Sequence, residues 1–348
     1  MNPLTLLLGV LLFSFSVSSA AIVPFINLLY SLKFQRAQQD TRDVFGKLTP
    51  VFNLFHQKKA GIPVGGGLLV IAVVALLFAL LLPLIQFFGI VITSNHKNIT
   101  AEVNILFFTF LSFGILGLYD DIKKFFKLDT AGFFGLRMKY KLLFEIVLAL
   151  IISFMLYFSL GISILNIPFI GTFNLGVFYI PFATFTIVAF ANAVNITDGL
   201  DGLAAGSLMI CLFGLWLLSA SILDVPLSLF LSLWIGALIS FLYFNIYPAR
   251  IFMGDVGSLS FGATLAVVGL LLGKPFALLI IGFIFVIEIT SSFIQLMSKR
   301  FFKRKIFPAA PIHLTLQKMG WEEPKIVQRA WLVQILLTMF GVWLTSIR

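Results

Sequence analysis

Charged residues are scarce in this chain. Asp, Glu, Lys and Arg together make up 11% of its 348 residues, whereas 60% of the residues are hydrophobic. A water-soluble globule needs a polar shell, which this composition cannot supply. The mean hydropathy of +1.08 leads to the same conclusion. The sequence therefore predicts a polytopic membrane protein.

Cysteine is also nearly absent, because Cys211 is the single one and lies within an apolar run. One cysteine excludes an internal disulfide and a thiolate metal site, so Cys211 is interpreted as a packing residue. The first apolar run has no basic segment before it, which argues against a cleaved signal peptide. Residues 1–30 are expected to form a retained helix, and residues 1–348 a single integral-membrane domain.

Ten apolar stretches of about 17 to 25 residues can be counted, each long enough to cross roughly 30 Å of hydrocarbon. They lack the alternation of barrel strands, and backbone amides in lipid must bond within their own segment, so α-helices are predicted. The expected fold is all-α. The predicted spans are 4–30, 64–92, 103–119, 142–160, 177–195, 203–222, 227–246, 258–273, 276–297 and 330–346. Residues 161–176 are expected to form a small external hairpin or re-entrant turn.

Basic residues are distributed asymmetrically between alternate loops. If the N-terminus lies outside, 21 of the 24 lysines and arginines fall in inside loops, and only Lys97, Lys274 and Arg348 lie outside. This split predicts that both termini lie on the external face. The net charge of +10 then belongs to the cytoplasmic face. The membrane topology alone can explain this positive charge, or the charge also attracts anionic lipids and phosphorylated substrates. No nucleic acid is expected as a partner.

The chain has only 14 acidic residues, yet five aspartates lie in three short segments at the ends of apolar runs: Asp120, Asp121, Asp198, Asp201 and Asp255. In the predicted topology all five fall on the cytoplasmic side. An isolated acid inside an apolar helix is costly, so acids gathered at helix ends indicate an aqueous active site on one membrane face. Adjacent side chains on a helix point about 100° apart, so Asp120 and Asp121 are expected to have different roles.

Two of these segments have a recognisable spacing. Asn192, Asn195, Asp198 and Asp201 recur at every third residue, which predicts a polar ladder along one side of a helical or 3₁₀ end. Asp255 is expected in a glycine-containing loop whose backbone amides approach a phosphate before the next span begins. Each pattern alone is commonly a cap or a turn. Together on one face they favour Mg²⁺, which takes one or two carboxylates plus phosphate oxygens.

The same segments resemble the polyprenyl-phosphate N-acetylhexosamine-1-phosphate transferase superfamily, of the glycosyltransferase 4 type. The resemblance covers nearly the whole chain, and within the superfamily it is closest to the phospho-N-acetylmuramoyl-pentapeptide transferases. It rests on YDD at 119–121, NAVNITDGLDGLAAG at 192–206, FNIYPARIFMGDVGSLSFG at 244–262, PIHLTLQKMGWEEPK at 311–325, KAGIPVGGG at 59–67 and DTAGFFGLRMKYK at 129–141.

The resemblance implies a phosphoglycosyl transferase of the bacterial cytoplasmic membrane. It implies transfer of phospho-N-acetylmuramoyl-pentapeptide from UDP-MurNAc-pentapeptide to undecaprenyl phosphate, which yields lipid I and UMP for peptidoglycan synthesis and requires Mg²⁺. One pyrophosphate bond replaces another, so catalysis consists of bringing two anionic phosphates together and shielding their repulsion. Two substrates and the bilayer are thus the implied partners, and a homodimer is left open.

The resemblance also implies roles for individual residues. Asp255 would be a Mg²⁺ ligand, and Asp120 would deprotonate or position the lipid phosphate with support from Asp121. His313 would also be catalytic, because it holds the first of three histidine positions that the family usually shows, although Leu314 and Thr315 occupy the other two. The implied substrate-binding residues are Lys59, Lys123 and Lys139 for the diphosphate, Asn192, Asn195, Asp198 and Asp201 for the nucleotide pocket, and Phe252 for stacking on uracil.

Three alternatives stay open. A sibling transferase that moves N-acetylglucosamine-1-phosphate, or a related sugar phosphate, shares the acidic segments. A transporter would place its site near the midplane in broken helices, and only Glu288 is predicted that deep. With Ser291, Ser292 and Gln295, however, Glu288 is interpreted as part of a polar stripe rather than as catalytic. The third alternative is a scaffold that has lost catalysis.

Overall fold

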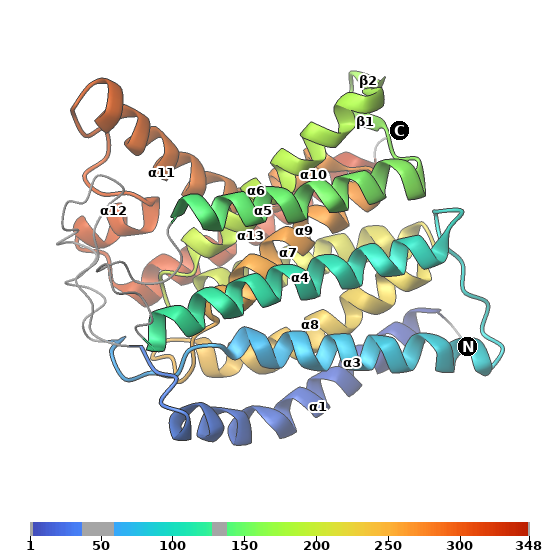
Figure 1. Cartoon of the computed structure of the whole chain (residues 1–348), viewed down its shortest axis with the longest axis horizontal. Coiled ribbons are helices and arrows are strands. Elements are labelled where there is room, and N and C mark those ends of the chain that lie inside the picture. The colour runs from blue at the N-terminus through green and yellow to red at the C-terminus, as the bar shows by residue number, and fades with distance from the viewer. Residues whose placement is uncertain (1–2, 37–58, 127–137, 347–348) are drawn as a thin grey trace.

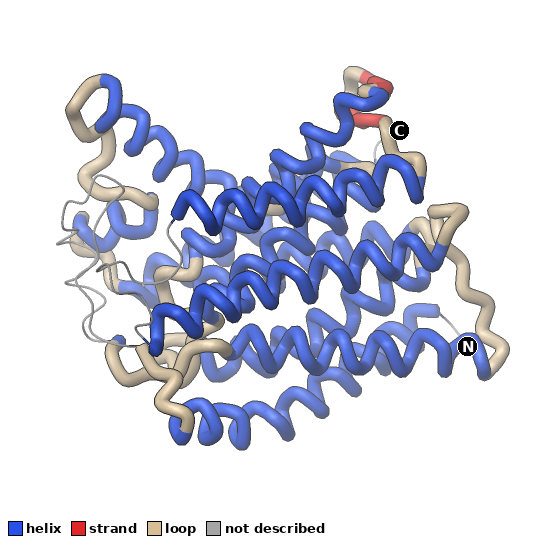
Figure 2. The backbone as a smooth tube through the Cα atoms, viewed as in Figure 1, coloured by secondary structure: helices blue, strands red, loops and turns tan. Residues whose placement is uncertain are grey.

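The computed structural model describes residues 3–36, 59–126 and 138–346. They form a bundle of helices with one small hairpin of strands (Figures 1 and 2). The elements are α1 (Pro3–Ser31), α3 (Gly66–Phe87), α4 (Ile99–Phe126), α5 (Met138–Phe154), β1 (Ile164–Ile167), β2 (Gly171–Asn174), α6 (Tyr179–Thr197), α7 (Leu203–Ser221), α8 (Val225–Asn245), α9 (Gly254–Leu271), α10 (Pro275–Ile281), α11 (Phe283–Phe301), α12 (Ile312–Lys318) and α13 (Glu323–Ser346).

The prediction of a polytopic helical membrane protein is confirmed. Nine of the described helices are long and apolar enough to cross a membrane, and the bent pair α10–α11 makes a tenth if it counts as one span. Each corresponds to one of the ten predicted stretches. The outer helices expose large apolar side chains, such as Leu80 on α3 and Leu336 on α13, as a surface that faces lipid requires.

The ninth predicted span, 276–297, is not one straight helix. α10 ends at Ile281, and α11 continues at an angle of 85° to it (Figure 1). Gly282 lies at the break, where an added Cβ would lie 2.8 Å from the Phe190 ring and 3.0 Å from the Leu278 carbonyl oxygen. The bend therefore needs a residue without a side chain. Glu288 lies on α11 beyond this bend, and its predicted depth midway through the membrane stays a prediction.

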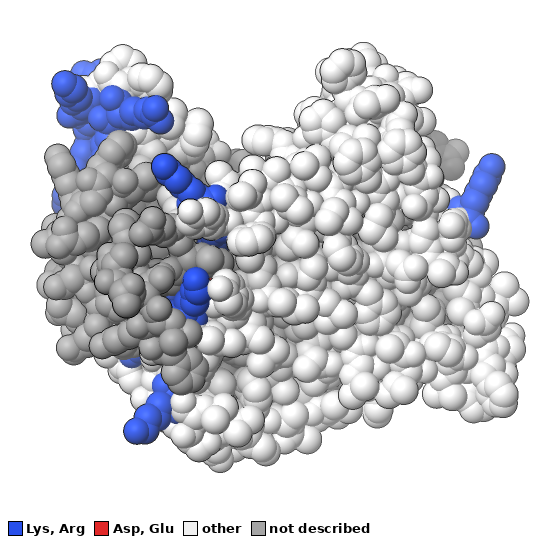
Figure 3. Space-filling model, in the orientation of Figure 1, with Lys and Arg blue, Asp and Glu red and all other residues white. Residues whose placement is uncertain are grey.

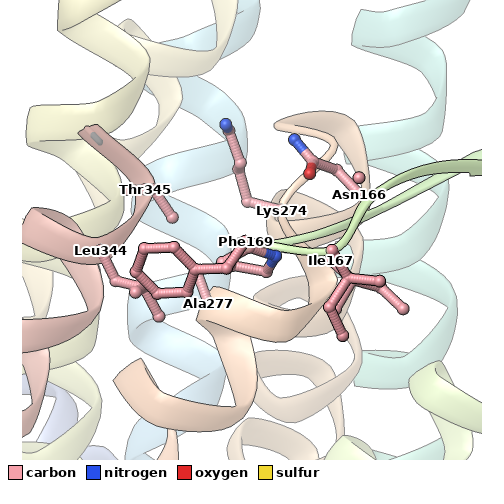
Figure 4. A pocket seen from close by; sticks show the side chains of 10 residues that line it. Asn166, Ile167, Phe169, Lys274, Ala277, Leu344 and Thr345 are labelled. Carbon is pink, nitrogen blue, oxygen red and sulfur yellow. The ribbon is translucent and has the colours of Figure 1, made fainter. Parts of the chain in front are cut away.

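The predicted hairpin within 161–176 is confirmed. β1 and β2 pair antiparallel, with Ile164 opposite Asn174 and Ile167 opposite Gly171. The hairpin lies at the end of the bundle where α9 gives way to α10 and where α13 ends. In Figure 4 the Phe169 ring reaches between Leu344 and Ala277. The hairpin thus covers that end of the bundle.

α9 lies at the centre of the bundle, is almost wholly buried, and packs along α4 and α6. Glycines allow very close helix crossings. A Cβ added to Gly117 of α4 would lie 2.1 Å from the backbone oxygen of Asp255, and one added to Gly67 of α3 would lie 2.2 Å from Gly257 Cα. Such close approach gives the van der Waals packing that joins helices in lipid. Because Asp120 follows Gly117 by one turn, this crossing brings Asp120 beside Asp255.

The aspartates singled out from the sequence all lie at one end of the bundle. α4 and α6 end there, whereas α7 and α9 begin there. The described chain starts and finishes at the opposite end, which is on the right in Figure 1. Basic side chains gather at the aspartate end in Figure 3. That this end faces the cytoplasm, with both termini outside, stays a prediction.

Candidate active site

Two lysines join the carboxylates at the end of α4 and the start of α9. Lys124 Nζ lies 3.0 Å from Asp120 Oδ2 and 2.7 Å from Asp255 Oδ2. Lys141 Nζ, from the first turn of α5, lies 3.2 Å from Asp120 Oδ2 and 2.5 Å from Asp255 Oδ2. The two carboxylates therefore face the same two ammonium groups. We call Asp120, Lys124, Lys141 and Asp255 the carboxylate–lysine cluster.

Asp121 makes a different contact from its neighbour Asp120. Its Oδ2 accepts a hydrogen bond of 3.0 Å from the backbone N–H of Val256, in the first turn of α9. A carboxylate there satisfies one of the free amides at a helix start and interacts favourably with the helix dipole. Asp121 thus fixes the turn that carries Asp255. The expected loop around Asp255 is wrong, because α9 already begins at Gly254.

A second group of charges joins three distant parts of the chain. Lys59 Nζ lies 2.6 Å from Asp201 Oδ1 and 2.5 Å from Glu323 Oε1, and both contacts are largely buried. Asp201 Oδ2 also accepts a 2.9 Å hydrogen bond from the backbone N–H of Ala249. We call Lys59, Asp201 and Glu323 the ion triad. Glu323 was missed from the sequence, although it lies within the quoted segment PIHLTLQKMGWEEPK.

The side chains of the predicted polar ladder on α6 bond to several different helices rather than to one. Asn192 Nδ2 donates to Glu145 Oε2 of α5 at 2.5 Å, and Asn195 Nδ2 donates to Ser258 Oγ of α9 at 2.7 Å. Asp198 is the residue that follows α6. These side chains therefore connect α6 to α5 and α9 at the aspartate end.

Asp198 interacts electrostatically with both the carboxylate–lysine cluster and the ion triad. Burial raises its pKa to about 8, although the Arg36 charge opposes this shift and the Asp255 charge adds to it. Burial lowers the pKa of Arg36, while Asp198 and Asp201 oppose that change. Arg36 was not singled out from the sequence, because nothing near it in the chain resembles a site. Asp198 is thus protonated for much of the time near pH 7.

Phe252 is buried among Val64, Ala249 and Phe125. The guanidinium carbon of Arg36 lies 5.5 Å from its ring centroid, and Lys59 Nζ lies 5.8 Å from it. Both distances are within the range of cation–π attraction. The ring is therefore adjacent to the ion triad, and its predicted stacking on uracil stays a prediction.

His313 is held by Glu288. Its Nδ1 lies 2.9 Å from Glu288 Oε2, and both side chains are buried. On the other side of the imidazole, a Cβ added to Gly199 would lie 2.6 Å from Nε2. His313 thus contacts the turn between Asp198 and Asp201.

The interpretation of a polar stripe on α11 is confirmed for Gln295, which accepts hydrogen bonds from the backbone of Ile306 and Phe307. Glu288, by contrast, contacts a residue of the candidate site. Leu314 and Thr315 are buried, and Thr315 Oγ1 donates to the Ala309 carbonyl. These two positions therefore pack within the segment before α13.

Two predicted basic residues lie beside the cluster rather than in it. Lys123 Nζ lies 5.0 Å from the Tyr119 ring centroid, and Lys139 is exposed at the start of α5. Their neighbours Lys124 and Lys141 make the carboxylate contacts. The spacing of Asp120 and Lys124 was a usable signal, because residues four apart meet on a helix. Residues 129–137 of the quoted segment lie outside the described residues.

The donor set fits Mg²⁺. Oδ2 of Asp120 and Oδ2 of Asp255 both lie within 3.2 Å of the Lys141 ammonium group, so a cation already occupies a position between them. Mg²⁺ typically binds one or two carboxylates and completes its shell with water and phosphate oxygens. Asp255, with Asp120 beside it, would hold the ion.

Residues 103–273 match glycosyl transferase family 4. The chain is 39% identical over 324 residues to a phospho-N-acetylmuramoyl-pentapeptide-transferase of Leuconostoc mesenteroides, covering 93% of this chain and 96% of the relative. It is 38% identical over 315 residues to a protein of that name from Clostridium perfringens, covering 90% and 89%. A relative of the same name from Orientia tsutsugamushi is 36% identical over 319 residues, covering 84% and 83%.

Proposed function

Because the chain belongs to the phospho-N-acetylmuramoyl-pentapeptide transferase family, we propose that it transfers phospho-N-acetylmuramoyl-pentapeptide from UDP-MurNAc-pentapeptide to undecaprenyl phosphate. The products are lipid I and UMP. The reaction takes place at the cytoplasmic face of the bacterial inner membrane, where a lipid acceptor and a cytosolic nucleotide can meet. A homodimer is a further hypothesis, which crosslinking in membranes would test.

The observation that carries this proposal is that Asp120 and Asp255 share the ammonium groups of Lys124 and Lys141. Transfer between two phosphates requires anionic groups to approach each other, and fixed positive charge in a partly water-free site reduces their repulsion. When bound, Mg²⁺ would add Lewis acidity and further charge shielding. Each lysine can move from a carboxylate to a phosphate oxygen, and its ammonium group then still has an anionic partner.

The other residues of the site would bind the two substrates or position the catalytic groups. Asp120 holds or deprotonates the phosphate of the lipid acceptor. Asp121 keeps the first turn of α9, and with it Asp255, in place. Asp198, Arg36 and Phe252 form the side of the site toward the nucleotide. His313, held by Glu288 against the α6–α7 turn, contacts the sugar diphosphate.

The experiment compares two donors with the purified protein in detergent, with Mg²⁺ and undecaprenyl phosphate present. UMP release is measured with UDP-MurNAc-pentapeptide and with UDP-N-acetylglucosamine, and lipid acceptor is omitted as a control. Faster release from the first donor is expected. Faster release from the second would identify the chain as a sibling transferase, an alternative favoured by Leu314 and Thr315 at the usual histidine positions. No acceptor-dependent release from either would reject transfer altogether.

A further inference from the structure

Three side chains with metal-binding atoms meet at the end of the bundle opposite the aspartates. His96 lies in the connection between α3 and α4, Glu102 in the first turn of α4, and Asp224 immediately before α8. One ligand atom from each lies within 4.8 Å of the other two. Glu102 and Asp120 are eighteen residues apart on α4, which corresponds to about 27 Å of helix. The group is therefore separate from the carboxylate–lysine cluster.

The Glu102 carboxylate is fully buried and only half satisfied. Its Oε2 accepts a 2.6 Å hydrogen bond from Ser94, whereas Oε1 has no hydrogen-bond partner within the described part of the chain. A buried polar atom left without a partner costs about 1–3 kcal/mol, and more when it is charged. A cation at Oε1 would remove this cost.

Asp224 is buried as well. Its Oδ1 caps α8 by accepting from the Leu227 amide at 3.2 Å, and its Oδ2 accepts from the Asn95 amide at 3.3 Å. Among residues 3–36, 59–126 and 138–346, no lysine or arginine forms an ion pair with Asp224 or with Glu102. Buried carboxylates are normally paired with a cation or coordinate a metal. Because Glu102 and Asp224 are two such carboxylates side by side, a cation between them is favoured further.

His96 is arranged as a neutral ligand. Its Nε2 lies 3.2 Å from the carbonyl oxygen of Leu271 at the end of α9. A carbonyl only accepts, so Nε2 carries a proton, and in the neutral ring Nδ1 then keeps its lone pair. Metal-bound histidines usually donate their second ring N–H in this way. Burial lowers the pKa of His96 and thus favours the neutral ring, although the Asp224 charge opposes the shift.

We propose that His96, Glu102 and Asp224 bind one divalent transition-metal ion of the zinc class, with water as the fourth ligand. One nitrogen and two carboxylates suit Zn²⁺, whereas Mg²⁺ prefers oxygen ligands alone. Tetrahedral bonds of about 2.1 Å place ligand atoms about 3.4 Å apart. The ligand atoms of the three side chains lie within 4.8 Å of one another, so each pair needs to approach by at most about 1.4 Å. His96 is half-buried and gives an ion access.

The ion would act as a clamp between helices. It would join the α3–α4 connection to the starts of α4 and α8, and through the His96–Leu271 hydrogen bond to the end of α9. α4 and α9 are the helices that bring Asp120 to Asp255, but the clamp itself takes no part in the transfer reaction. Its existence is therefore independent of the proposed function.

The test uses the full-length protein purified in detergent, stripped with chelator, and loaded with ZnCl₂ in excess Mg²⁺ before desalting. Excess Mg²⁺ is included to compete with zinc for the carboxylates of the aspartate end. Elemental analysis should find about one zinc ion per chain, and zinc should raise the melting temperature, as a ligand of the folded state does. With Co²⁺ in place of Zn²⁺, a visible absorption band typical of tetrahedral coordination should appear.

His96→Ala and Glu102→Gln should each lose the bound ion and the Co²⁺ band. His313→Ala and Lys97→Ala should keep both, since one removes another buried histidine and the other a charge next to His96. If His96→Ala does not fold, Glu102→Gln decides, because it preserves side-chain size. A wild-type protein that retains no zinc, or equal zinc in the wild type and Glu102→Gln, would overturn the proposal and leave a carboxyl pair that shares a proton.

Discussion

His313 Nδ1 lies 2.9 Å from Glu288 Oε2, and neither side chain is accessible to solvent. This pair gives Glu288 a place in the candidate site that its sequence position does not suggest. The bend at Gly282 turns α11 so that Glu288 meets the start of α12, 25 residues further along the chain. The imidazole is thereby held against the α6–α7 turn.

Changing Glu288 should therefore lower the turnover rate. A hydrogen bond to a charged group contributes about 1.5–3 kcal/mol, so Glu288→Ala should reduce kcat by about 10- to 100-fold, and Glu288→Gln, which keeps an acceptor, by less. Steady-state UMP release measures both. Ser298→Ala is the control, because Ser298 lies on the same helix but bonds to the Arg304 carbonyl. Full activity of Glu288→Ala would mean that the pair only packs.

Asp255→Asn should abolish Mg²⁺-dependent turnover while the protein still folds. A neutral amide removes the negative charge that strengthens a Mg²⁺ site, and it cannot form the ion pairs with Lys124 and Lys141. Turnover is measured over a Mg²⁺ titration, and folding by gel filtration in detergent. Glu322→Gln makes the same chemical change at an exposed position and should have no effect. An active Asp255→Asn protein would remove this residue from the metal site.

The two lysines of the carboxylate–lysine cluster should behave differently from the two lysines beside it. Lys124→Met and Lys141→Met each remove a charge that bridges Asp120 and Asp255, and each should reduce kcat at least about tenfold, which corresponds to about 1.4 kcal/mol. Lys123→Met and Lys139→Met should change kcat by less than a factor of about two by the same conversion. The reverse pattern in UMP release would favour the lysines chosen from sequence alone.

Gly117→Ala should reduce both stability and activity. The new Cβ would lie 2.1 Å from the Asp255 backbone oxygen, so α4 must move away from α9. Overpacking of this kind costs about 1–3 kcal/mol, and a movement of this sort separates Asp120 from Asp255. The melting temperature and kcat are measured together. Gly9→Ala, at a position with open space around the added Cβ, is the control. Unchanged values for Gly117→Ala would show that the crossing tolerates a side chain.

Stability should fall between pH 6 and pH 8 through Asp198. Its pKa is raised to about 8 by burial, so the folded state keeps a proton that the unfolded chain has already lost. The free energy of unfolding therefore decreases as pH rises toward 8, by at most about 1.4 kcal/mol per pH unit. Asp198→Asn removes this titration, and its melting temperature in detergent should decrease less over that range. An equal decrease in both proteins would contradict the raised pKa.

The sequence was sufficient for what depends on local patterns. The ten apolar stretches, the hairpin at 161–176 and the grouping of the aspartates at one end all follow from hydropathy, turn residues and the alternation of helices. Contacts between distant segments were not accessible in this way. Lys141 and Glu323 reach their partners only because α5 and α13 pack beside α4 and α7, and no spacing in the chain records that.

The bend at Gly282 shows a second limit. An apolar stretch of suitable length predicts that a segment can cross a membrane, but not that it does so in one straight piece. The close approach to Phe190 that requires a glycine is a property of the packed bundle. Because the sequence does not reveal the bend, it does not reveal the contact between Glu288 and His313 either.

The ion triad has a consequence for biosynthesis. Lys59 and Glu323 are 264 residues apart. A ribosome must therefore have synthesised nearly the entire polypeptide before Glu323 emerges to meet Lys59. Until then Lys59 and Asp201 lack their third partner, and the Asp201 amide lacks its acceptor. A nascent chain inserted in the membrane is thus expected to complete the ion triad only after the segment that carries Glu323 has been made and α13 has docked.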